Sequence, residues 1–472
     1  MRPLKLHATK HGALVWDVVG MAVFGAFASF IVHAKFAGAY SVTLWVMLLS
    51  LAAVPLMCAV AWQVAPPTAR QVLGWAIATR LLAFWSTPFF EDDFYRYLWD
   101  GYQTIIGNNP YALAPSAFFS TDVLVLGGVP VPAPVAGALS ALNNPDIPTI
   151  YGPALQWLFA LAAQVSPGAL WPIRALWLAV DVWLIAVLIT HCGARRAMLY
   201  ALCPLVLHEV GVAAHPDGVM GALLLFAWVA LKNRQAWLCG MWLGCAAAMK
   251  IHLLLALPFL LIACGWGAPS VRIVVGCALT YAAFWLPFVL PPIGSAEAFY
   301  QAWRSFATFA RDWQFNALGF GLLRGVFDSG LARILAGGAM LFCWLGIAYF
   351  QIRQSHQKSG CNSAKAALVA AFGVLLFFSP VINAWYLLWL LPLAATTRLV
   401  TPWVASVVLP LSYLTHFNLG ATTVSGGAFT PYALPSAIPI VEGIAIGLAL
   451  CWDYRQATLR RSFRPIQAPV II

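Results

Sequence analysis

The densest run of charge in the chain is EDDFYRYLWDG at residues 91–101, directly after the apolar stretch TPFF. Only 9% of the residues are charged, so three adjacent acids at the start of this run need a cause. If the run is helical, Arg96 lies one turn after Asp92 and one turn before Asp100. A carboxylate here could act as a general base toward a hydroxyl or could hold a divalent cation. The alternative is a solvated helix end with charge pairs, but adjacent carboxylates repel one another, so we favour a functional site.

Two turn-rich motifs follow, IIGNNPYALAPS at 105–116 and ALNNPDIPTIYGP at 141–153. Asn-Pro and Asp-Ile-Pro sequences form turns. Their polar side chains could cap those turns or could face a substrate. Each motif alone favours the turn interpretation.

A third cluster lies in PLVLHEVGVAAHPDGVM, which carries His208, Glu209, His215 and Asp217. Ionisable side chains at membrane depth are costly and usually face a cavity, so these residues are candidates for a site. The same residue types could bind a metal, but their spacing matches no metal-binding signature.

Cations and aromatic residues complete the candidates. Lys250 in AAAMKIHLLLALP lies at the outer face under the orientation derived below, where a basic residue suggests an anionic ligand such as phosphate. Arg304 and Arg311 belong to AEAFYQAWRSFATFARDW, an amphipathic stretch suited to the membrane interface, where contact with anionic lipid is the alternative role. Trp385 and Tyr386 in SPVINAWYLLWLLP lie at a membrane boundary, where an aromatic belt is the alternative.

The elements that position these residues are predicted to be membrane-spanning helices. The chain has 472 residues, of which 62% are hydrophobic and 14% aromatic, and its mean hydropathy is +0.83. Apolar runs of about 15 to 22 residues recur throughout, each near the length that crosses a bilayer. The net charge of +11 is scattered at the ends of these runs, so no nucleic-acid partner is expected. The ten cysteines contain no CxxC pattern, which favours buried thiols over a zinc site or disulfide framework.

The distribution of charge predicts the orientation. With the N-terminus in the cytoplasm and the first apolar run retained as a span, 17 of the 26 basic residues fall inside, as the positive-inside rule requires. The same threading places 11 of the 15 acids on or near the outer face. Acids are weak determinants of orientation, so their accumulation on one side indicates an outer-face reaction site.

Three outer segments are expected to be long, at 91–170, 291–331 and 417–435. In the first, ALQWLFALAAQVSPG is predicted to be a juxtamembrane or re-entrant helix, because counting it as a span would invert everything after it. The predicted spans are 13–33, 42–63, 71–89, 171–191, 198–212, 218–232, 236–249, 251–266, 271–290, 332–352, 365–380, 384–396, 401–416 and 436–453.

Taken together, these motifs resemble a known family. The elements DDFYRYLWDG, GNNPYALAP, NNPDIPTIYGP, His-Pro-Asp-Gly, a Lys ahead of LLLALP, and SP…AWYLLWLLP follow one another in order between about residues 71 and 396. They resemble the bacterial polyprenol-phosphate-mannose-dependent mannosyltransferases of the GT-C superfamily of integral-membrane glycosyltransferases. The chain departs from the pattern in having two spans before the motif-bearing one, and in His215-Pro216-Asp217 where His-Asn-Asp would be expected.

The resemblance implies a catalytic acid in the first large outer loop and an active site at the outer face. By position, Asp92 and Asp93 are the catalytic pair, with Asp92 favoured as the base. The cations expected to bind the donor phosphate are Arg96, Lys250, Arg304 and Arg311. The residues expected to bind substrate are Tyr97, Trp99, Asp100, Asn109, Tyr111, Asn144, Tyr151, His208, Glu209, His215, Asp217, Trp385 and Tyr386.

The predicted fold is an all-α polytopic membrane protein, a GT-C-like bundle of about 12–14 transmembrane helices with short outer-face juxtamembrane helices. We expect one integral-membrane glycosyltransferase domain over 1–472, with an outer catalytic loop at about 91–170 and a second outer loop at about 291–331. It should lie in a bacterial cytoplasmic (inner) membrane, with both termini cytoplasmic and the active site facing the periplasm.

The implied reaction moves a hexose, with mannose favoured, from a polyprenyl-phosphate-linked sugar donor to a lipid or glycan acceptor hydroxyl, with inversion at the anomeric carbon. Membrane lipids are further partners. No obligatory cofactor is implied, with a divalent cation such as Mg or Mn as a possible addition. One alternative is a transporter or flippase for a lipid-linked sugar, which would need polar residues at mid-membrane, where mainly Asp181 and Glu442 are found. The other is a glycan ligase, for which the early acidic pair has no role.

Overall fold

The protein is described here from a computed structural model, which places residues 10–36, 40–119, 125–126, 129–355, 360–415, 418 and 432–462. Helices dominate these residues, and the two strands among them, β1 (Val125–Leu126) and β2 (Val129–Pro130), form one short antiparallel hairpin. The chain is an all-α polytopic membrane protein, as predicted.

Six helices in the described part of the chain are long and apolar enough to cross a membrane. A seventh candidate is a pair of helices, 204–212 and 217–232, bent by 115° at the break between them. The six single spans are Leu14–Ala34, Leu44–Val64, Trp171–Cys192, Ala268–Val289, Ser329–Gln354 and Ala437–Leu459.

Among the described residues, the helices that qualify as single spans are fewer than the 12–14 spans expected from the sequence, and shorter apolar helices account for part of the difference. Several apolar runs are short or interrupted helices: the predicted span 384–396 consists of η4 (Ala384–Trp389) and α18 (Leu391–Ala395). Both are buried inside the protein. A short apolar run is equally compatible with a buried core segment and with part of a span, so hydropathy alone overcounts.

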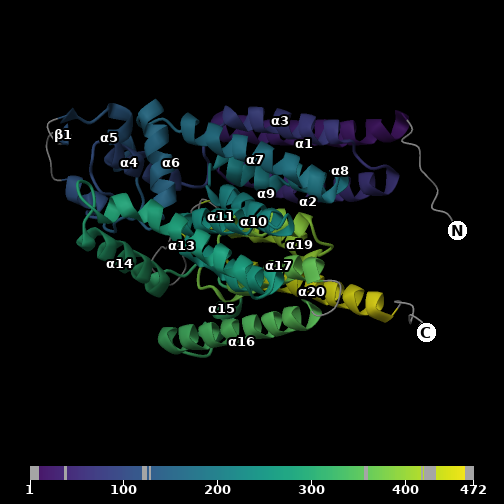
Figure 1. Cartoon of the computed structure of the whole chain (residues 1–472). Coiled ribbons are helices and arrows are strands. Elements are labelled where there is room, and N and C mark those ends of the chain that lie inside the picture. The colour runs from purple at the N-terminus through teal and green to yellow at the C-terminus, as the bar shows by residue number, and fades with distance from the viewer. Residues whose placement is uncertain are drawn as a thin grey trace.

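The N-terminal helices pack side by side at one edge of the bundle (Figure 1). They are α1 (Lys10–Phe36), α2 (Tyr40–Val64), α3 (Ala69–Phe84), α7 (Trp171–Cys192) and α8 (Ala194–Ala201). A buried polar network joins three of them. Arg80 Nε of α3 donates to Asp181 Oδ2 of α7 over 2.8 Å, and Tyr200 of α8 donates to Asp181 Oδ1 over 2.8 Å. Asp181, one of the two mid-membrane acids, therefore holds helices together.

Close backbone packing joins the central helices α11 (Ala236–Met249) and α13 (Ala268–Val289). Gly240 and Gly244 form a Gly-xxx-Gly pair on α11. A Cβ at Gly240 would lie 2.3 Å from the Ile273 carbonyl oxygen, and one at Gly244 would lie 2.6 Å from that of Cys277. Small residues at this spacing let membrane helices approach closely.

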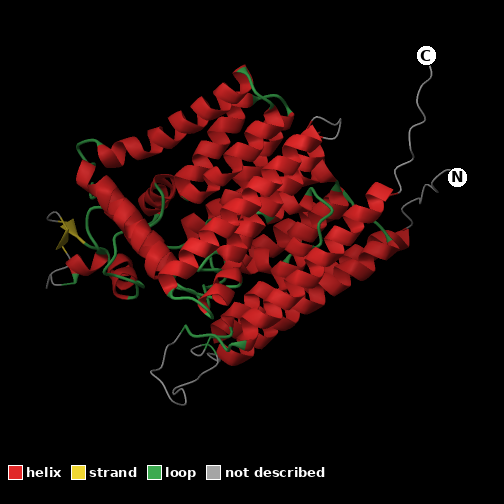
Figure 2. Cartoon of the chain, turned by 90° about the horizontal axis from the view of Figure 1, so that it is seen from below, coloured by secondary structure: helices red, strands yellow, loops and turns green. Residues whose placement is uncertain are grey.

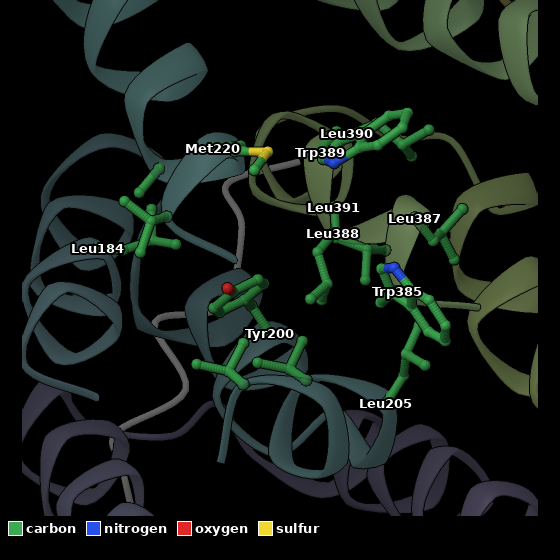
Figure 3. Close-up of a cluster of buried hydrophobic side chains, with 14 of the residues drawn as sticks. Leu184, Tyr200, Leu205, Met220, Trp385, Leu387, Leu388, Trp389, Leu390 and Leu391 are labelled. Carbon is green, nitrogen blue, oxygen red and sulfur yellow. The ribbon is translucent and has the colours of Figure 1, made fainter. Parts of the chain in front are cut away.

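The segment η4–α18 forms part of the core beside α10 (Asp217–Lys232). Figure 3 shows its Leu388 and Leu391 among Met220 of α10, Leu184 of α7 and Tyr200 of α8. A Cβ at Gly221 of α10 would lie 2.1 Å from the Leu388 carbonyl oxygen, so only glycine permits this contact. This close contact positions η4, whose side chains line the site described below.

The short helices α4 (Asp93–Ile105), α5 (Ala133–Ser140), α6 (Pro153–Val165) and α14 (Ala296–Asp312) gather with the hairpin at one end of the bundle (Figures 1 and 2). The start of α1 and the end of α20 (Ala437–Ser462) lie at the opposite end. The acidic run is helical from Asp93 onward, and the predicted amphipathic stretch forms α14. The helix predicted in ALQWLFALAAQVSPG is α6.

The remaining elements complete the bundle. They are η1 (Pro115–Phe118), α9 (Pro204–Val206), the π-turn η2 (Leu207–Val212), η3 (Ile251–Leu255), α12 (Ala256–Cys264), α15 (Gly319–Arg324), α16 (Ser329–Ser355), α17 (Gly360–Phe378), α19 (Thr401–Val408) and η5 (Leu409–Tyr413).

Candidate active site

A cavity of about 1490 Å³ lies among the elements at the α4 and α14 end of the bundle. Its wall comes from the loop before α4 and the first turn of α4, the loop between α5 and α6, and the junction of α11 with η3. The rest comes from α13, α14 and the loop after it, the end of α17, η4 and η5. Segments that are far apart in the chain thus meet around one space, which is typical of a ligand site.

The acidic run forms one wall of this cavity. Asp92 occupies the N-cap position of α4 and Asp93 its first turn, where the partial positive charge of a helix N-terminus favours acids. Asn143, from the loop between α5 and α6, donates through Nδ2 to Asp92 Oδ1 over 2.6 Å and to Asp93 Oδ1 over 3.1 Å. One amide group therefore holds the two carboxylates side by side. Phe90, two residues before Asp92, has a φ of 72°. This backbone conformation is strained for a bulky residue, and such strain often accompanies functional sites.

Burial and repulsion between carboxylates favour the protonated forms of Glu91 and Asp92. Burial raises the pKa of Asp92, the Asp93 charge raises it further, and the hydrogen bond from Asn143 opposes both effects. Burial also raises the pKa of Glu91 well above its usual range, and the charges of Asp93 and Glu209 add to that. A carboxylate whose pKa is raised toward neutrality is suited to accept a proton during a reaction.

The Arg96 guanidinium organises a loop of the cavity wall. It donates to the carbonyl oxygens of Asn143 at 3.2 Å, Asn144 at 2.9 Å and Ile147 at 3.1 Å. Arg96 lies one turn after Asp92 and one turn before Asp100, as the sequence spacing predicts, but its guanidinium donates to these carbonyl oxygens. Asp100 is buried and accepts from Gln156 at 3.1 Å. Arg96 therefore positions the loop that carries Asn143.

A buried histidine cluster lies behind the acids. Glu209 Oε2 accepts from His215 Nδ1 at 2.9 Å, while its Oε1 accepts from His208 Nδ1 at 3.1 Å and from Tyr413 Oη at 2.8 Å. The opposite ring nitrogen of His215, Nε2, lies 3.8 Å from Asp93 Oδ2. The cluster predicted around the break before α10 therefore contacts the acidic run through one histidine.

Lys250 supplies a cation on another wall of the cavity. Its ammonium group lies 2.8 Å from Asp217 Oδ1, and it faces the rings of Tyr386 and Trp389 at 4.8 and 5.3 Å from their centroids. Trp389 Nε1 also donates to Asp217 Oδ1 over 2.6 Å. The side chain of Lys250 is 17% exposed, so its head group is held in place by Asp217 and the aromatic rings while it borders the cavity.

The cavity brings together about half of the residues expected from the sequence. Tyr97 lies behind its wall, and the pKa of its buried hydroxyl is raised by burial and then by the charges of Asp93 and Asp217, which shows that both acids lie near it. The predicted residues on the cavity wall are Asp92, Asp93, Arg96, Tyr111, Asn144, Tyr151, Lys250, Trp385 and Tyr386. Those packed behind the wall or beside it are Tyr97, Asp100, Asn109, His208, Glu209, His215 and Asp217.

Several of these residues support the wall through hydrogen bonds. Tyr111 Oη donates to the Tyr151 carbonyl oxygen over 2.7 Å. Asn109 Nδ2 donates to the carbonyl oxygens of Phe288 and Ile293 at 3.0 and 3.3 Å. The motif around residues 105–116 thus ties the loop after α4 to the end of α13.

Three predicted site residues lie away from the cavity. Arg304 and Arg311 are exposed on α14, whose cavity-facing side carries Trp303, Phe306 and Phe309 instead. Arg311 pairs with its neighbour Asp312. Trp99 is buried against α5 in a separate cluster. An amphipathic helix presents its charges opposite its apolar face, and here the apolar face borders the cavity.

Sequence reasoning missed Asn143, Trp389 and Tyr413. Asn143 stands next to the predicted Asn144 in the same motif, and only the fold determines which of the two side chains faces the acids. Tyr413 reaches Glu209 across 204 positions, a contact that no local pattern indicates.

In the described part of the chain, no group of three or more His, Cys, Asp or Glu side chains is arranged to hold a metal ion. The possible Mg or Mn ion stays a prediction, and no side chain is assigned to it.

Comparison with known proteins gives one match. No curated protein and no solved structure matches the chain. Residues 6–265, more than half of the 472, match the family model described as "Alpha-(1->6)-mannopyranosyltransferase, N-terminal domain". The matched region contains Asp92, Asn143, His215 and Lys250, and it supports a mannosyl transfer activity. The chain therefore belongs to the MptA_B family of alpha-(1->6)-mannopyranosyltransferases.

Proposed function

We propose that this protein transfers mannose from a polyprenyl-phosphate donor to the 6-hydroxyl of a mannose-containing lipid or glycan acceptor, at the outer face of the membrane. The observation that carries the proposal is one cavity with the Asp92 and Asp93 carboxylates on one wall and the Lys250 ammonium group on another. The family description supplies the sugar and the linkage.

The carboxylate wall suits activation of an acceptor hydroxyl. In the proposed step, the acceptor oxygen attacks the anomeric carbon and Asp92 takes the hydroxyl proton. The bond from the anomeric carbon to the phosphate oxygen breaks, and its electron pair leaves with the phosphate. Attack opposite the leaving group inverts the configuration, so an alpha product requires a beta-linked donor. Burial and the neighbouring Asp93 charge raise the pKa of Asp92, which makes its carboxylate a better proton acceptor.

The Lys250 wall suits the departing phosphate. A phosphodiester gains a negative charge as it leaves the sugar, and a preorganised cation stabilises that charge in the transition state. Lys250 is held by Asp217 and by two aromatic rings, so little reorganisation is needed when the phosphate binds. A lipid-linked donor also agrees with a cavity built among membrane helices.

The proposed orientation has the end of the bundle opposite the cavity in the cytoplasm. Basic side chains gather there: Arg196 and Lys365 both donate to the Thr396 carbonyl oxygen, and Lys365 and Lys232 lie over the Trp228 ring. Such residues mark the cytoplasmic side under the positive-inside rule. The cavity then faces the outside, in a bacterial inner membrane.

The two mid-membrane acids give little support to a transporter. Asp181 pairs with Arg80 and Tyr200, and Glu442 accepts from Asn316 at 2.9 Å. Both are buried in internal contacts, whereas a transport path would need polar groups along a route between the two sides.

The test is a transfer assay with the full-length protein in lipid nanodiscs. Polyprenyl phosphates that carry labelled mannose, glucose or arabinose are each incubated with an alpha-mannoside acceptor. The expected result is transfer of mannose alone into a product whose new linkage is alpha-(1→6). Transfer directly from a nucleotide sugar, with no transfer from the lipid donor, would contradict the proposal.

A further inference from the structure

We propose that His215 is a positioning residue that carries a positive charge between Glu209 and Asp93, and so keeps the Asp92–Asp93 pair ionised for catalysis. This inference rests on the proposed function, since it assigns a role to a side chain behind the base. It concerns a residue that lies outside the cavity wall.

Glu209, which binds His215, is fully buried. Its carboxylate accepts from His208, His215 and Tyr413. Hydrogen bonds donated to a carboxylate favour its ionised form. A buried negative charge needs a positive partner nearby, and the two histidines that donate to Glu209 are the groups in contact with it that can become cationic.

The two histidines that donate to Glu209 have different surroundings. The His208 ring packs against Phe30, Phe90 and Tyr413. Nε2 of each ring is buried with no hydrogen-bond partner among the described residues, but in that part of the chain only Nε2 of His215 is near a second carboxylate, 3.8 Å from Asp93 Oδ2. A neutral ring would turn a lone pair toward the Asp93 carboxylate, which is repulsive. A protonated ring turns an N–H toward it.

The His215 ring also has an aromatic neighbour. The ring lies flat on Trp385, with centroids 4.1 Å apart and planes 14° apart, and an aromatic face stabilises a cation. Carboxylates outnumber cations among the side chains near His215. The ionisable groups around His215 are Glu209 and His208 of η2, Asp93 of α4 with Glu91 before it, Tyr97 of α4, Tyr413 of η5, and the Asp217–Lys250 pair.

A positive charge on His215 affects the ionisation of the Asp92–Asp93 pair. Asp92 and Asp93 share the Asn143 amide, and two close carboxylates tend to hold one proton between them. A fixed cation 3.8 Å behind Asp93 opposes this tendency. Asp92 then stays ionised at a pH where it would otherwise be protonated.

The test is the pH dependence of kcat/KM for the full-length enzyme and for His215→Gln. Loss of the cation should raise the pKa of the base. The pH below which kcat/KM falls, the acid limb of the profile, should therefore move upward by about one unit. At pH values below this limb, kcat/KM of the variant should be about tenfold lower than that of the wild type. At pH values above it, the two should be equal. His208→Gln is the matched control, since it removes the other histidine bound to Glu209, and its acid limb should stay in place. An unmoved limb in His215→Gln, or an equal shift in both variants, would overturn the inference.

A second measurement does not depend on the folding of a variant. In the wild-type protein labelled with ¹⁵N-histidine and reconstituted in lipid, at least one of the nine histidines should keep both ring nitrogens protonated at pH 8. If every histidine is neutral at pH 8, the inference fails. A wild-type enzyme that transfers no mannose from the lipid donor would instead contradict the proposed function, and the charge on the histidines would still be measured.

Discussion

Asn143 and Asp92 are 51 positions apart in the chain, yet the Asn143 amide donates to the Asp92 carboxylate over 2.6 Å. The loop that carries Asn143 is held by three hydrogen bonds from Arg96 to its carbonyl oxygens. Arg96 lies on α4, one turn after Asp92. The helix that presents the proposed base therefore also fixes the loop that orients it.

Asn143→Ala should make activity more sensitive to acid. The lost hydrogen bond favours the ionised form of Asp92, so its removal raises an already raised pKa. The base is then protonated up to a higher pH. We expect kcat/KM to fall about tenfold near pH 6, with the deficit shrinking as the pH rises.

The matched control is Asn108→Ala. Asn108 donates to Gln103 at 2.9 Å and lies outside the cavity, so its loss should leave the pH profile unchanged. Identical pH profiles for Asn143→Ala and the wild type would remove Asn143 from the support of the base.

Lys250→Ala should weaken use of the lipid donor. The loss of a charge-assisted contact to phosphate should raise the KM for the donor or lower kcat by roughly 10- to 100-fold. The single variant also leaves Asp217 buried without its cation, which destabilises the fold. Lys250→Ala combined with Asp217→Asn avoids that problem, because the asparagine oxygen can still accept from Trp389. The double variant should recover folded protein, measured by thermal unfolding in detergent, but should not recover donor kinetics.

Arg304→Ala and Arg311→Ala provide the comparison for Lys250. Both side chains are exposed on the side of α14 away from the cavity, so the donor KM should stay within about twofold of the wild-type value. A large rise in either variant, with unchanged kinetics in the Lys250 variant, would transfer the phosphate site to α14.

The orientation predicts which engineered cysteines are accessible from outside. In a background where the exposed Cys451 is replaced by serine, Ala117→Cys near η1 should react in whole cells with a membrane-impermeant thiol reagent. Asn233→Cys, at the end of α10, should react only after the membrane is opened. Both native side chains are exposed. The reverse pattern would place the cavity in the cytoplasm and contradict a periplasmic active site.

Much of the site could be predicted because its residues lie in short sequence motifs that contain ionisable side chains, and such side chains are costly to place in an apolar membrane protein. The acids before α4, the histidines at the break before α10 and Lys250 were each unusual in an apolar chain, and the structure gathers them at one cavity. Partners could not be predicted in the same way. The i,i+4 spacing pointed Arg96 at Asp92 and Asp100, but carbonyl oxygens from a loop 47 to 51 positions away take its donors.

The number of long spanning helices in the described part of the chain is lower than the number of apolar runs, for a different physical reason. Apolar runs such as 384–396 are hydrophobic on all sides because protein surrounds them, and their composition matches that of lipid-facing helices. Leu388, for example, packs against Gly221 of α10. Only the tertiary contacts separate such segments from spans.

The most direct test of the account is turnover by Asp92→Asn. The asparagine keeps an oxygen that can accept from Asn143 and keeps the shape of the site, but it cannot take a proton from the acceptor. We predict that kcat falls about 100-fold or more while the KM for the lipid donor changes little. In Asp93→Asn, kcat should fall less than in Asp92→Asn. Full activity in Asp92→Asn, measured with polyprenyl-phosphate mannose and an alpha-mannoside acceptor, would contradict its assignment as the base.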